Sequence, residues 1–214
     1  MVGGPLSGRI IKSDACVAEG MVWLCAQDVR FACAYERTGT LPLRRKPEGF
    51  AELLSAIMSQ QVSVASANAI WARLVAAGLD DPSRVAAATE DALRACGLSR
   101  QKIKYAHALA AAAIDFEALH DLPDGDVIKT LTAVSGIGPW TAEIYAMFSL
   151  GRADVFAHGD LALQEAAKVL FDLPARPNEK EMRAMAVAWS PWRSVAARLL
   201  WAYYRLEKDR EGIS

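Results

Sequence analysis

The 214-residue sequence has no apolar run long enough to cross a membrane. A transmembrane helix needs about 20 consecutive, predominantly apolar residues, and polar residues interrupt every apolar stretch before that length. The opening MVGGPLSGRIIKSD also lacks the apolar segment of a secretory signal peptide. We therefore expect a cytoplasmic protein that has no membrane partner.

Cysteine is scarce, and its spacing excludes several kinds of site. The four cysteines are Cys16, Cys25, Cys33 and Cys96, and none of them forms a CxxC pair or another metal-ligand spacing. Reduced thiols in a cytosolic protein are the simplest interpretation. The spacing also argues against an iron–sulfur cluster held by four clustered cysteines.

The sequence has no excess of charge of either sign, because its formal net charge is −1. A nucleic-acid partner is not excluded, but its binding site would have to be local rather than spread over the whole surface. Apolar residues make up 53% of the chain and charged residues 23%, which is typical of a globular protein and unlike a disordered one.

Alternating β-branched runs, which mark half-buried strands, are missing as well. Apolar residues instead recur at the spacing of one buried helix face. The clearest example comprises Phe50, Leu53, Leu54, Ile57 and Met58. The same spacing recurs in Val127, Ile128 and Leu131, in Ile144, Tyr145 and Phe148, and in Trp192, Val195, Leu199 and Leu206. We predict an all-α fold.

Two polar, proline-containing segments punctuate the chain, GTLPLRRKPEGF at 39–50 and DLPARPNEKE at 172–181. The first carries three consecutive bases, Arg44, Arg45 and Lys46. We predict a helical lead-in over residues 1–46 that packs with the C-terminal helices, followed by a core over residues 47–210.

Within that core, residues 134–142 read VSGIGPWTA between two apolar helical stretches. We predict one helix from about Asp126 into Val134 and a second that begins near Pro139 or Trp140. The two glycines permit positive φ and close backbone approach, and proline suits the first turn of a helix. Such a hairpin directs backbone N–H groups toward an anion at a helix N-terminus, which favours phosphate. A plain corner between helices, whose glycines only allow a sharp turn, is the alternative.

The stretch LTAVSGIGPWTAEIYAMFSLG, followed by HGD at 158–160, resembles the helix–hairpin–helix (HhH-GPD) DNA glycosylase superfamily. Three more segments resemble other helices of that superfamily in the same order: FAELLSAIMSQQVSVASANAIWARL, LRACGLSRQKIKYAHALA and PWRSVAARLLWAYY. The resemblance covers about residues 48–206, and the most similar branch is DNA-3-methyladenine glycosylase II. It implies two helical subdomains with a DNA-binding and active-site cleft between them.

The resemblance also implies roles for particular residues. Asp160 corresponds to the catalytic carboxylate, and Trp140 and Trp201 correspond to aromatic walls of the base pocket. Gln60 and Gln61 fall where the superfamily inserts or supports a wedge in the gap left by a flipped base, although the best-known bacterial relatives have Leu at the second position. The hairpin residues expected to bind DNA are Gly136, Ile137, Gly138 and Thr141.

Cofactors and partners follow from the same resemblance. The carbonyl groups of Thr132, Val134 and Gly136 correspond to those that hold a structural monovalent cation, Na⁺ or K⁺, between hairpin and DNA. No cofactor is expected for catalysis. The implied partner is double-stranded DNA containing alkylated bases, bound by a monomer that is nucleoid-associated when it acts.

Each of these assignments has a simpler alternative. Asp160 precedes LALQEAAKVLF and is therefore also a good helix N-cap, and both roles are compatible. Trp140 and Trp201 can be ordinary core aromatics, and the Gln pair can be a solvated helix end. His158, two residues before Asp160, has two interpretations, a position near the site and an ordinary surface position, of which we expect the second. The bases at 44–46, with Arg100, Lys102 and Lys104, either contact phosphates or are solvated.

The residue after GIGP distinguishes two reaction types within the superfamily. Relatives such as endonuclease III carry a lysine there, whose amine attacks the sugar and forms a Schiff base. Here the residue is Trp140. The resemblance therefore implies a monofunctional enzyme that hydrolyses the N-glycosidic bond of alkylated purines, of the 3-methyladenine and 7-methylguanine type, and leaves an abasic site.

Other functions remain open from the sequence. A non-catalytic helix–hairpin–helix DNA-binding protein would need neither Asp160 nor the aromatic positions. Glycosylases for mismatched adenine or thymine glycol usually carry a C-terminal cysteine cluster, which this sequence lacks. A purely structural helical bundle would not explain why all the motifs occur in order.

Overall fold

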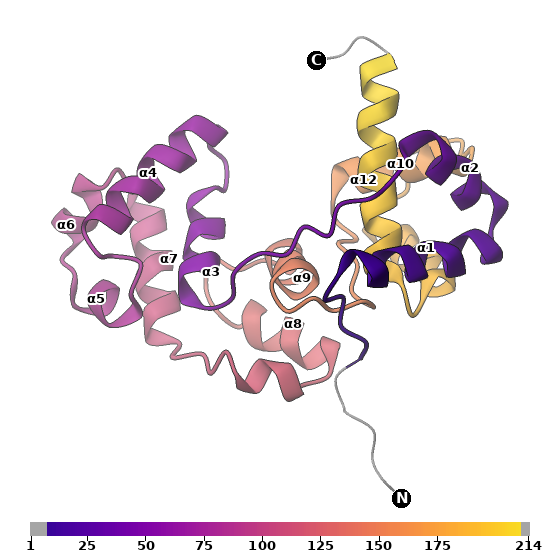
Figure 1. Ribbon diagram of the computed structural model, residues 1–214. Coiled ribbons are helices and arrows are strands. Elements are labelled where there is room, and N and C mark those ends of the chain that lie inside the picture. The colour runs from indigo at the N-terminus through magenta and orange to yellow at the C-terminus, as the bar shows by residue number, and fades with distance from the viewer. Residues whose placement is uncertain (1–7, 211–214) are drawn as a thin grey trace, which may run out of the picture. The chain divides into compact units, whose positions relative to one another are not determined.

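The computed structural model describes residues 8–210, and their regular structure is helical apart from one isolated β-bridge between Ile10 and Arg152 (Figure 1). The all-α prediction is therefore confirmed. Two of the elements, η1 and η2, are short 3₁₀ helices. In chain order the elements are α1 (Asp14–Gln27), α2 (Val29–Thr38), α3 (Phe50–Met58), α4 (Val64–Ala76), α5 (Pro82–Ala87), α6 (Glu90–Ala95), α7 (Arg100–Ala111), η1 (Ala118–Asp121), α8 (Asp124–Thr132), α9 (Pro139–Phe148), α10 (Leu161–Leu170), α11 (Glu179–Met185), η2 (Ala186–Trp189) and α12 (Arg193–Arg210).

The described residues form two compact units. The first unit joins residues 8–45 to residues 146–210, and the second is the continuous segment 46–145. None of the helices in residues 8–210 is both long and apolar enough to span a membrane.

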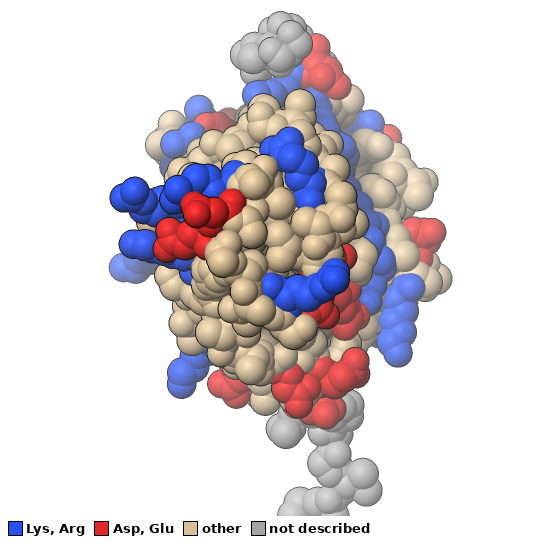
Figure 2. All heavy atoms as spheres, turned by 90° about the vertical axis from the view of Figure 1, so that its left-hand side faces the viewer, with Lys and Arg blue, Asp and Glu red and all other residues tan. Residues whose placement is uncertain are grey.

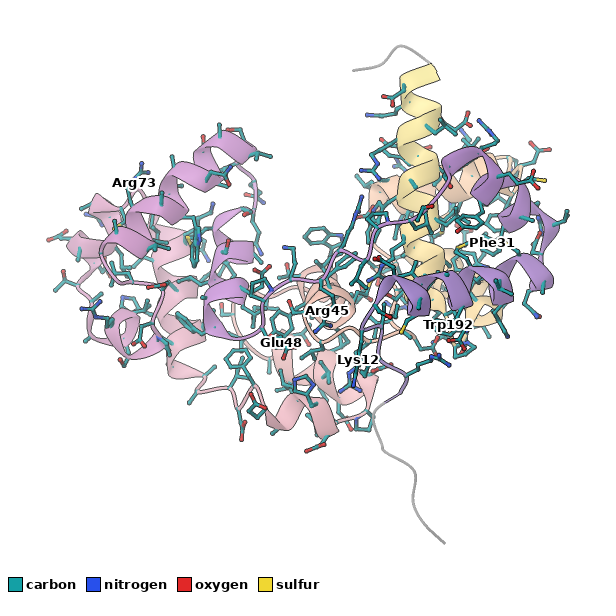
Figure 3. All side chains as sticks on the ribbon, in the orientation of Figure 1. Lys12, Phe31, Arg45, Glu48, Arg73 and Trp192 are labelled. Atoms are coloured by element: carbon teal, nitrogen blue, oxygen red, sulfur yellow. The ribbon has the colours of Figure 1, made fainter. Side chains whose placement is uncertain are left out.

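In the second unit, α7 is the central helix and packs against α3, α5 and α6 (Figure 1). The apolar face predicted for residues 50–58 is buried throughout, with Leu53, Leu54 and Ile57 fully inaccessible. Arg73 of α4, labelled in Figure 3, donates its Nε–H to the Cys96 carbonyl at 2.8 Å and so ties α4 to the end of α6. Side-chain caps start four of these helices, at Ser63, Asp81, Thr89 and Ser99.

In the first unit, α12 is the central helix and packs against α10, α2 and α1. Gly20 of α1 allows this close approach, because a Cβ there would lie 2.7 Å from the Trp192 and Val195 side chains. Phe31 packs edge-on against Phe171 and Trp189, with 5.7 Å between the ring centroids in each pair. Figure 3 labels Phe31 and Trp192 in this unit. The lead-in thus contributes directly to the core that carries the C-terminal helices.

Candidate functional site

The Gly-x-Gly segment forms a tight hairpin between α8 and α9 in the second unit. Helix α8 runs from Asp124 to Thr132, so both ends lie two residues earlier than the sequence suggested. It ends early because the Val134 N–H bonds the Leu131 carbonyl at 3.1 Å, a tightened turn that does not continue the helix. The start of α9 at Pro139 is as predicted.

Only one of the two hairpin glycines has the conformation that requires glycine. Gly136 has φ +97°, and a Cβ there would lie 2.5 Å from the Tyr105 ring. Gly138 does not have positive φ, and a Cβ there would meet no atom within 4 Å. The sequence indicated that both glycines permit positive φ and close backbone approach; Gly136 has the positive φ, and Gly138 leaves open space in front of its backbone.

The N–H groups of the hairpin fall into two classes. The Ile137 N–H is bonded to the Val134 carbonyl at 3.1 Å, and the Ile137 side chain is buried. Ile137 therefore anchors the hairpin in its unit. The first i→i−4 bond of α9 runs from Ala142 to Gly138 at 3.1 Å. The Thr141 N–H precedes that bond and has no acceptor within the helix, so it points toward the space beyond the N-terminus of α9.

The Gln pair lies beside the hairpin, although it is far away in sequence. Gln60 donates from Nε2 to the Gly136 carbonyl at 3.0 Å and to Thr141 Oγ1 at 3.4 Å, so it is not a solvated helix end. Gln61 is exposed and has φ +57°, a left-handed conformation that is costly for a residue other than glycine. One side chain fixes the hairpin, and the other projects from a strained turn.

These elements share one open groove of about 600 Å³ within the second unit. Seven of the residues singled out from the sequence line it, together with Tyr105 and Pro139. Trp140 is 46% exposed at its edge. The lining residues are Gln60, Gln61, Tyr105, Gly136, Ile137, Gly138, Pro139, Trp140 and Thr141.

The carbonyls assigned to a monovalent cation surround the same turn. The Val134 carbonyl accepts from Ile137 and the Gly136 carbonyl accepts from Gln60, and each keeps a second lone pair. Thr132 ends α8, where the last carbonyls have no donor within the helix and the helix dipole favours a cation. Oxygen ligands of this kind fit Na⁺ or K⁺.

Asp160 belongs to the first unit and is the N-cap of α10. Its Oδ1 accepts the Ala162 N–H at 2.9 Å and the Leu163 N–H at 3.0 Å. The same oxygen accepts the Trp201 indole Nε1–H at 3.2 Å, and Oδ2 takes none of these three bonds. The carboxylate is therefore aimed rigidly by three donors on one oxygen, so the cap alternative is correct and leaves the catalytic assignment possible.

Trp201, which the resemblance assigned to a wall of the base pocket, contacts Phe148 in addition to Asp160. Its ring lies 5.7 Å from the Phe148 ring at an interplanar angle of 35°. Because the ring is held by Phe148 and its N–H by Asp160, Trp201 fixes the direction of the carboxylate.

His158 is buried at 8% exposure, so the expectation of a surface histidine is wrong. Its ring packs against Phe156 at 5.2 Å, and its carbonyl accepts Gln164 Nε2 at 3.0 Å. The buried Gln164 thereby fastens the HGD turn from inside the unit, and His158 is part of that support.

The basic residues singled out from the sequence differ in whether they contact other groups of the protein. Lys46 is paired with Glu52 at 2.7 Å, and Lys102 donates to the Met58 carbonyl at 2.5 Å at the end of α3. Arg100 and Lys104 are exposed. Figure 2, seen from the side of α4 to α7, shows basic and acidic side chains interspersed over a largely uncharged surface. Any affinity for a polyanion on this face must come from local donors.

Residues 54–192, which include the Gln pair, the hairpin and Asp160, match the family model described as HhH-GPD superfamily base excision DNA repair protein. The chain belongs to this superfamily.

Individual relatives agree with that assignment. DNA-3-methyladenine glycosylase 1 of Schizosaccharomyces pombe is 32% identical over 170 residues, covering 75% of each chain. The crystal structure of DNA-3-methyladenine glycosidase from Bacillus halodurans has a TM-score of 0.77 and 35% identity, covering 90% of each chain. The 3-methyladenine DNA glycosylase of S. pombe in complex with abasic DNA has a TM-score of 0.74 and 29% identity, covering 86% of this chain and 95% of that one.

The sequence did not single out Tyr105 or Gln164. Tyr105 lies five residues beyond the start of α7, and its ring limits the space at Gly136. Gln164 is polar at a position of α10 that periodicity assigns to the core, flanked by buried Leu163 and Ala167. A polar residue on an apolar face was the available signal for Gln164; Tyr105 gave no local signal.

Proposed function

We propose that the protein is a base-excision-repair DNA glycosylase that removes alkylated purines, of the 3-methyladenine and 7-methylguanine type. Membership of the superfamily supports glycosylase chemistry, and the names of the relatives support alkylated bases as the substrate class. The observation that carries the proposal is Asp160, whose carboxylate is aimed by two backbone amides and an indole N–H.

The substrate chemistry matches aromatic side chains. A damaged base inside a duplex must be rotated out of the stack, which costs a few kcal/mol. Methylation at a ring nitrogen makes a purine cationic, and an indole face attracts a cation by about 0.5–2 kcal/mol. Trp140, half exposed at the groove edge, can stack on such a base. This attraction favours alkylated over normal purines without a unique hydrogen-bond pattern.

Asp160 acts on the sugar. Departure of the base leaves positive charge on the deoxyribose, as at other glycosidic centres. A fixed carboxylate stabilises that charge and orients or deprotonates the attacking water. Its three donors hold Oδ1, and Oδ2 takes none of those bonds. One carboxylate is sufficient because the cationic base is already a good leaving group.

The reaction stops at the abasic site. Trp140 occupies the position where lyase relatives place a nucleophilic lysine, and an indole cannot form a Schiff base. The enzyme is therefore monofunctional.

Double-stranded DNA is the partner, bound by a monomer that works in the cytoplasm on the nucleoid. The groove lined by the hairpin and the Gln pair binds the backbone through N–H groups such as that of Thr141. Gln61 is the wedge, because it is exposed on a strained turn, and Gln60 supports the hairpin. The carbonyls of Thr132, Val134 and Gly136 would hold a structural Na⁺ or K⁺, whose positive charge would help the hairpin to bind a phosphate.

Base release from methylated duplex DNA tests the proposal. The protein is incubated with DNA treated with a methylating agent, and the soluble products are separated and identified by mass spectrometry. We expect free 3-methyladenine or 7-methylguanine and a DNA strand that breaks only after alkali or heat. Release of unmodified bases alone, or of none, contradicts the proposal.

A further inference from the structure

Two arginines, Arg44 and Arg45, lie in the connector before α3 and have no role in the site described above. Arg44 and Arg45 belong to the first unit, as do Arg198 and Arg205 of α12. Arg45, labelled in Figure 3, occupies the space that a Cβ of Gly151 would need. Arg44 is exposed and has φ +53°, a left-handed conformation that residues other than glycine rarely adopt.

Arg198 explains this backbone conformation. Its side chain is 2% exposed, and its Nε and Nη2 donate to the Leu43 carbonyl at 3.3 and 3.1 Å. Its Nη1 donates to the Ser194 carbonyl at 2.8 Å. The guanidinium thus holds the residue directly before Arg44. Burial, and then the nearby Arg44 and Arg45, lower the pKa of Arg198 to about 10, so it remains charged at neutral pH.

Among the described residues, three of these four arginines have no carboxylate partner. Within residues 8–210, neither Arg44, Arg198 nor Arg205 forms an ion pair with a carboxylate. The pKa of Arg44 is lowered, first by partial burial and then by Arg205. The exposed Arg44 and Arg205 are near enough for their charges to interact, and like charges repel unless an anion lies between them.

The cluster adjoins Asp160 through α12. Arg198, Trp201 and Arg205 occupy i, i+3 and i+7 positions, which lie on one face of a helix. Phe148 contacts two of them, with its ring 4.8 Å from the Arg198 guanidinium and 5.7 Å from the Trp201 ring. Trp201 in turn donates to Asp160. The exposed Arg205 therefore lies on the same face of α12 as Trp201, which orients the Asp160 carboxylate.

We propose that Arg44 and Arg205 together bind one backbone phosphate of the DNA, next to the nucleotide on which Asp160 acts. Guanidinium groups match phosphate oxygens with paired, charge-assisted hydrogen bonds. This site differs from the hairpin, which offers backbone N–H groups from the second unit. The inference rests on the proposed function, because that function supplies the DNA.

Duplexes with one neutral methylphosphonate linkage test the site directly. The linkage is placed in turn at successive positions around a tetrahydrofuran abasic-site analogue, and the dissociation constant is measured for each duplex. For the wild-type protein we expect a loss of affinity at the hairpin-bound linkages and at one further linkage, there by roughly tenfold, as for a hydrogen bond between charged groups. In an Arg44→Gln/Arg205→Gln double variant, the penalty at that further linkage should vanish while the others persist.

The salt dependence of binding provides a second measurement. Loss of one duplex phosphate contact lowers the slope of log K against log salt by about 0.9. We expect that change in the double variant, and no change in Lys180→Gln, which removes an exposed charge of α11 in the same unit. The single variants should not be additive, because both arginines serve one phosphate.

An unchanged methylphosphonate pattern and salt slope in the double variant overturn the proposal. Circular-dichroism melts check that the variants fold, which we expect because both side chains are exposed. These binding measurements do not need base release. If the slope changes but no methylated base is released, the phosphate site stands and only the proposed reaction fails.

Discussion

At the scale of single residues, the orientation of the Asp160 carboxylate depends on the three hydrogen-bond donors that bind its Oδ1. Asp160 was recognisable from the sequence in two roles, cap and carboxylate, and the structure shows how one side chain serves as a cap while being aimed. The Trp201 bond was not predictable, because Trp201 lies 41 residues away and no local pattern connects the two. The buried His158 was missed for a similar reason, since its burial depends on Phe156 and Gln164 packing around the turn.

Trp201→Phe should slow base excision without weakening DNA binding. The phenyl ring keeps the tilted ring contact with Phe148 but cannot donate to Asp160 Oδ1. A hydrogen bond to a charged group contributes about 1.5–3 kcal/mol, so we expect single-turnover excision to fall by about one to two orders of magnitude. An excision rate equal to that of the wild type would show that the indole N–H does not position the carboxylate.

Borohydride should trap no covalent adduct between enzyme and DNA. Schiff-base formation needs an amine, and the position where lyase relatives have one is Trp140 here. The amine of Lys102 is already bound to the Met58 carbonyl at the end of α3. Gel electrophoresis after reduction, with an adduct-forming lyase as the positive control, checks this expectation. Efficient trapping would mean that another amine attacks the sugar, and the enzyme would not be monofunctional.

At the scale of elements, sequence patterns predicted helices better than the turns that join them. The face of α3 is buried as its spacing indicated, and α9 starts at its proline. The hairpin was identified from its glycines, but the division of labour between Gly136 and Gly138 was not. That division is set by the Tyr105 ring from α7, a contact 31 residues away in sequence, which propensity and periodicity do not encode.

Substitution of the two hairpin glycines should therefore have different consequences: loss of stability at Gly136 and loss of DNA affinity at Gly138. Gly136→Ala forces a Cβ against the Tyr105 ring at positive φ and should lower the free energy of unfolding by about 1–3 kcal/mol. Gly138→Val should fold normally, because its surroundings are open, but should block close approach of a phosphate. We expect its affinity to fall for damaged and undamaged DNA alike, since phosphate contacts carry no base information.

Thermal melts and binding titrations of both variants separate these effects. Single-turnover base release at saturating Gly138→Val enzyme should recover much of the wild-type rate. A folded Gly138→Val protein that binds DNA as tightly as the wild type would reduce the hairpin to a corner between helices.

At the scale of the whole chain, the sequence indicated a lead-in and a core, and the structure shows which parts share a core. Residues 8–45 complete the unit that carries Asp160, because Met21, Leu24 and Phe31 are buried in it. Helical periodicity marks which face of α2 is apolar, but it does not say which partner covers that face. The lead-in was predicted to pack with the C-terminal helices, but the sequence did not specify that α12 is the helix that both α1 and α2 contact.

Removal of residues 1–45 should destabilise the first unit selectively. The face of α12 that α1 and α2 cover would become exposed, and apolar burial contributes about 25 cal/mol per Å². Limited proteolysis should then cleave within residues 146–210 while residues 46–145 stay protected. Equal protection of both segments would show that the lead-in is dispensable for this core.

Asp160 performs the glycosidic chemistry in the proposed function, and the Asp160→Asn variant is the sharpest test of this role. Asparagine caps a helix about as well as aspartate, so α10 and the fold should be preserved, but the amide carries no charge to stabilise the developing cation. The measurement is single-turnover release of 3-methyladenine and 7-methylguanine from methylated duplex DNA at saturating enzyme, with the dissociation constant for the same DNA as control. We expect excision to be abolished while binding stays near that of the wild type; near-wild-type release by the folded variant would show that Asp160 is not the catalytic carboxylate.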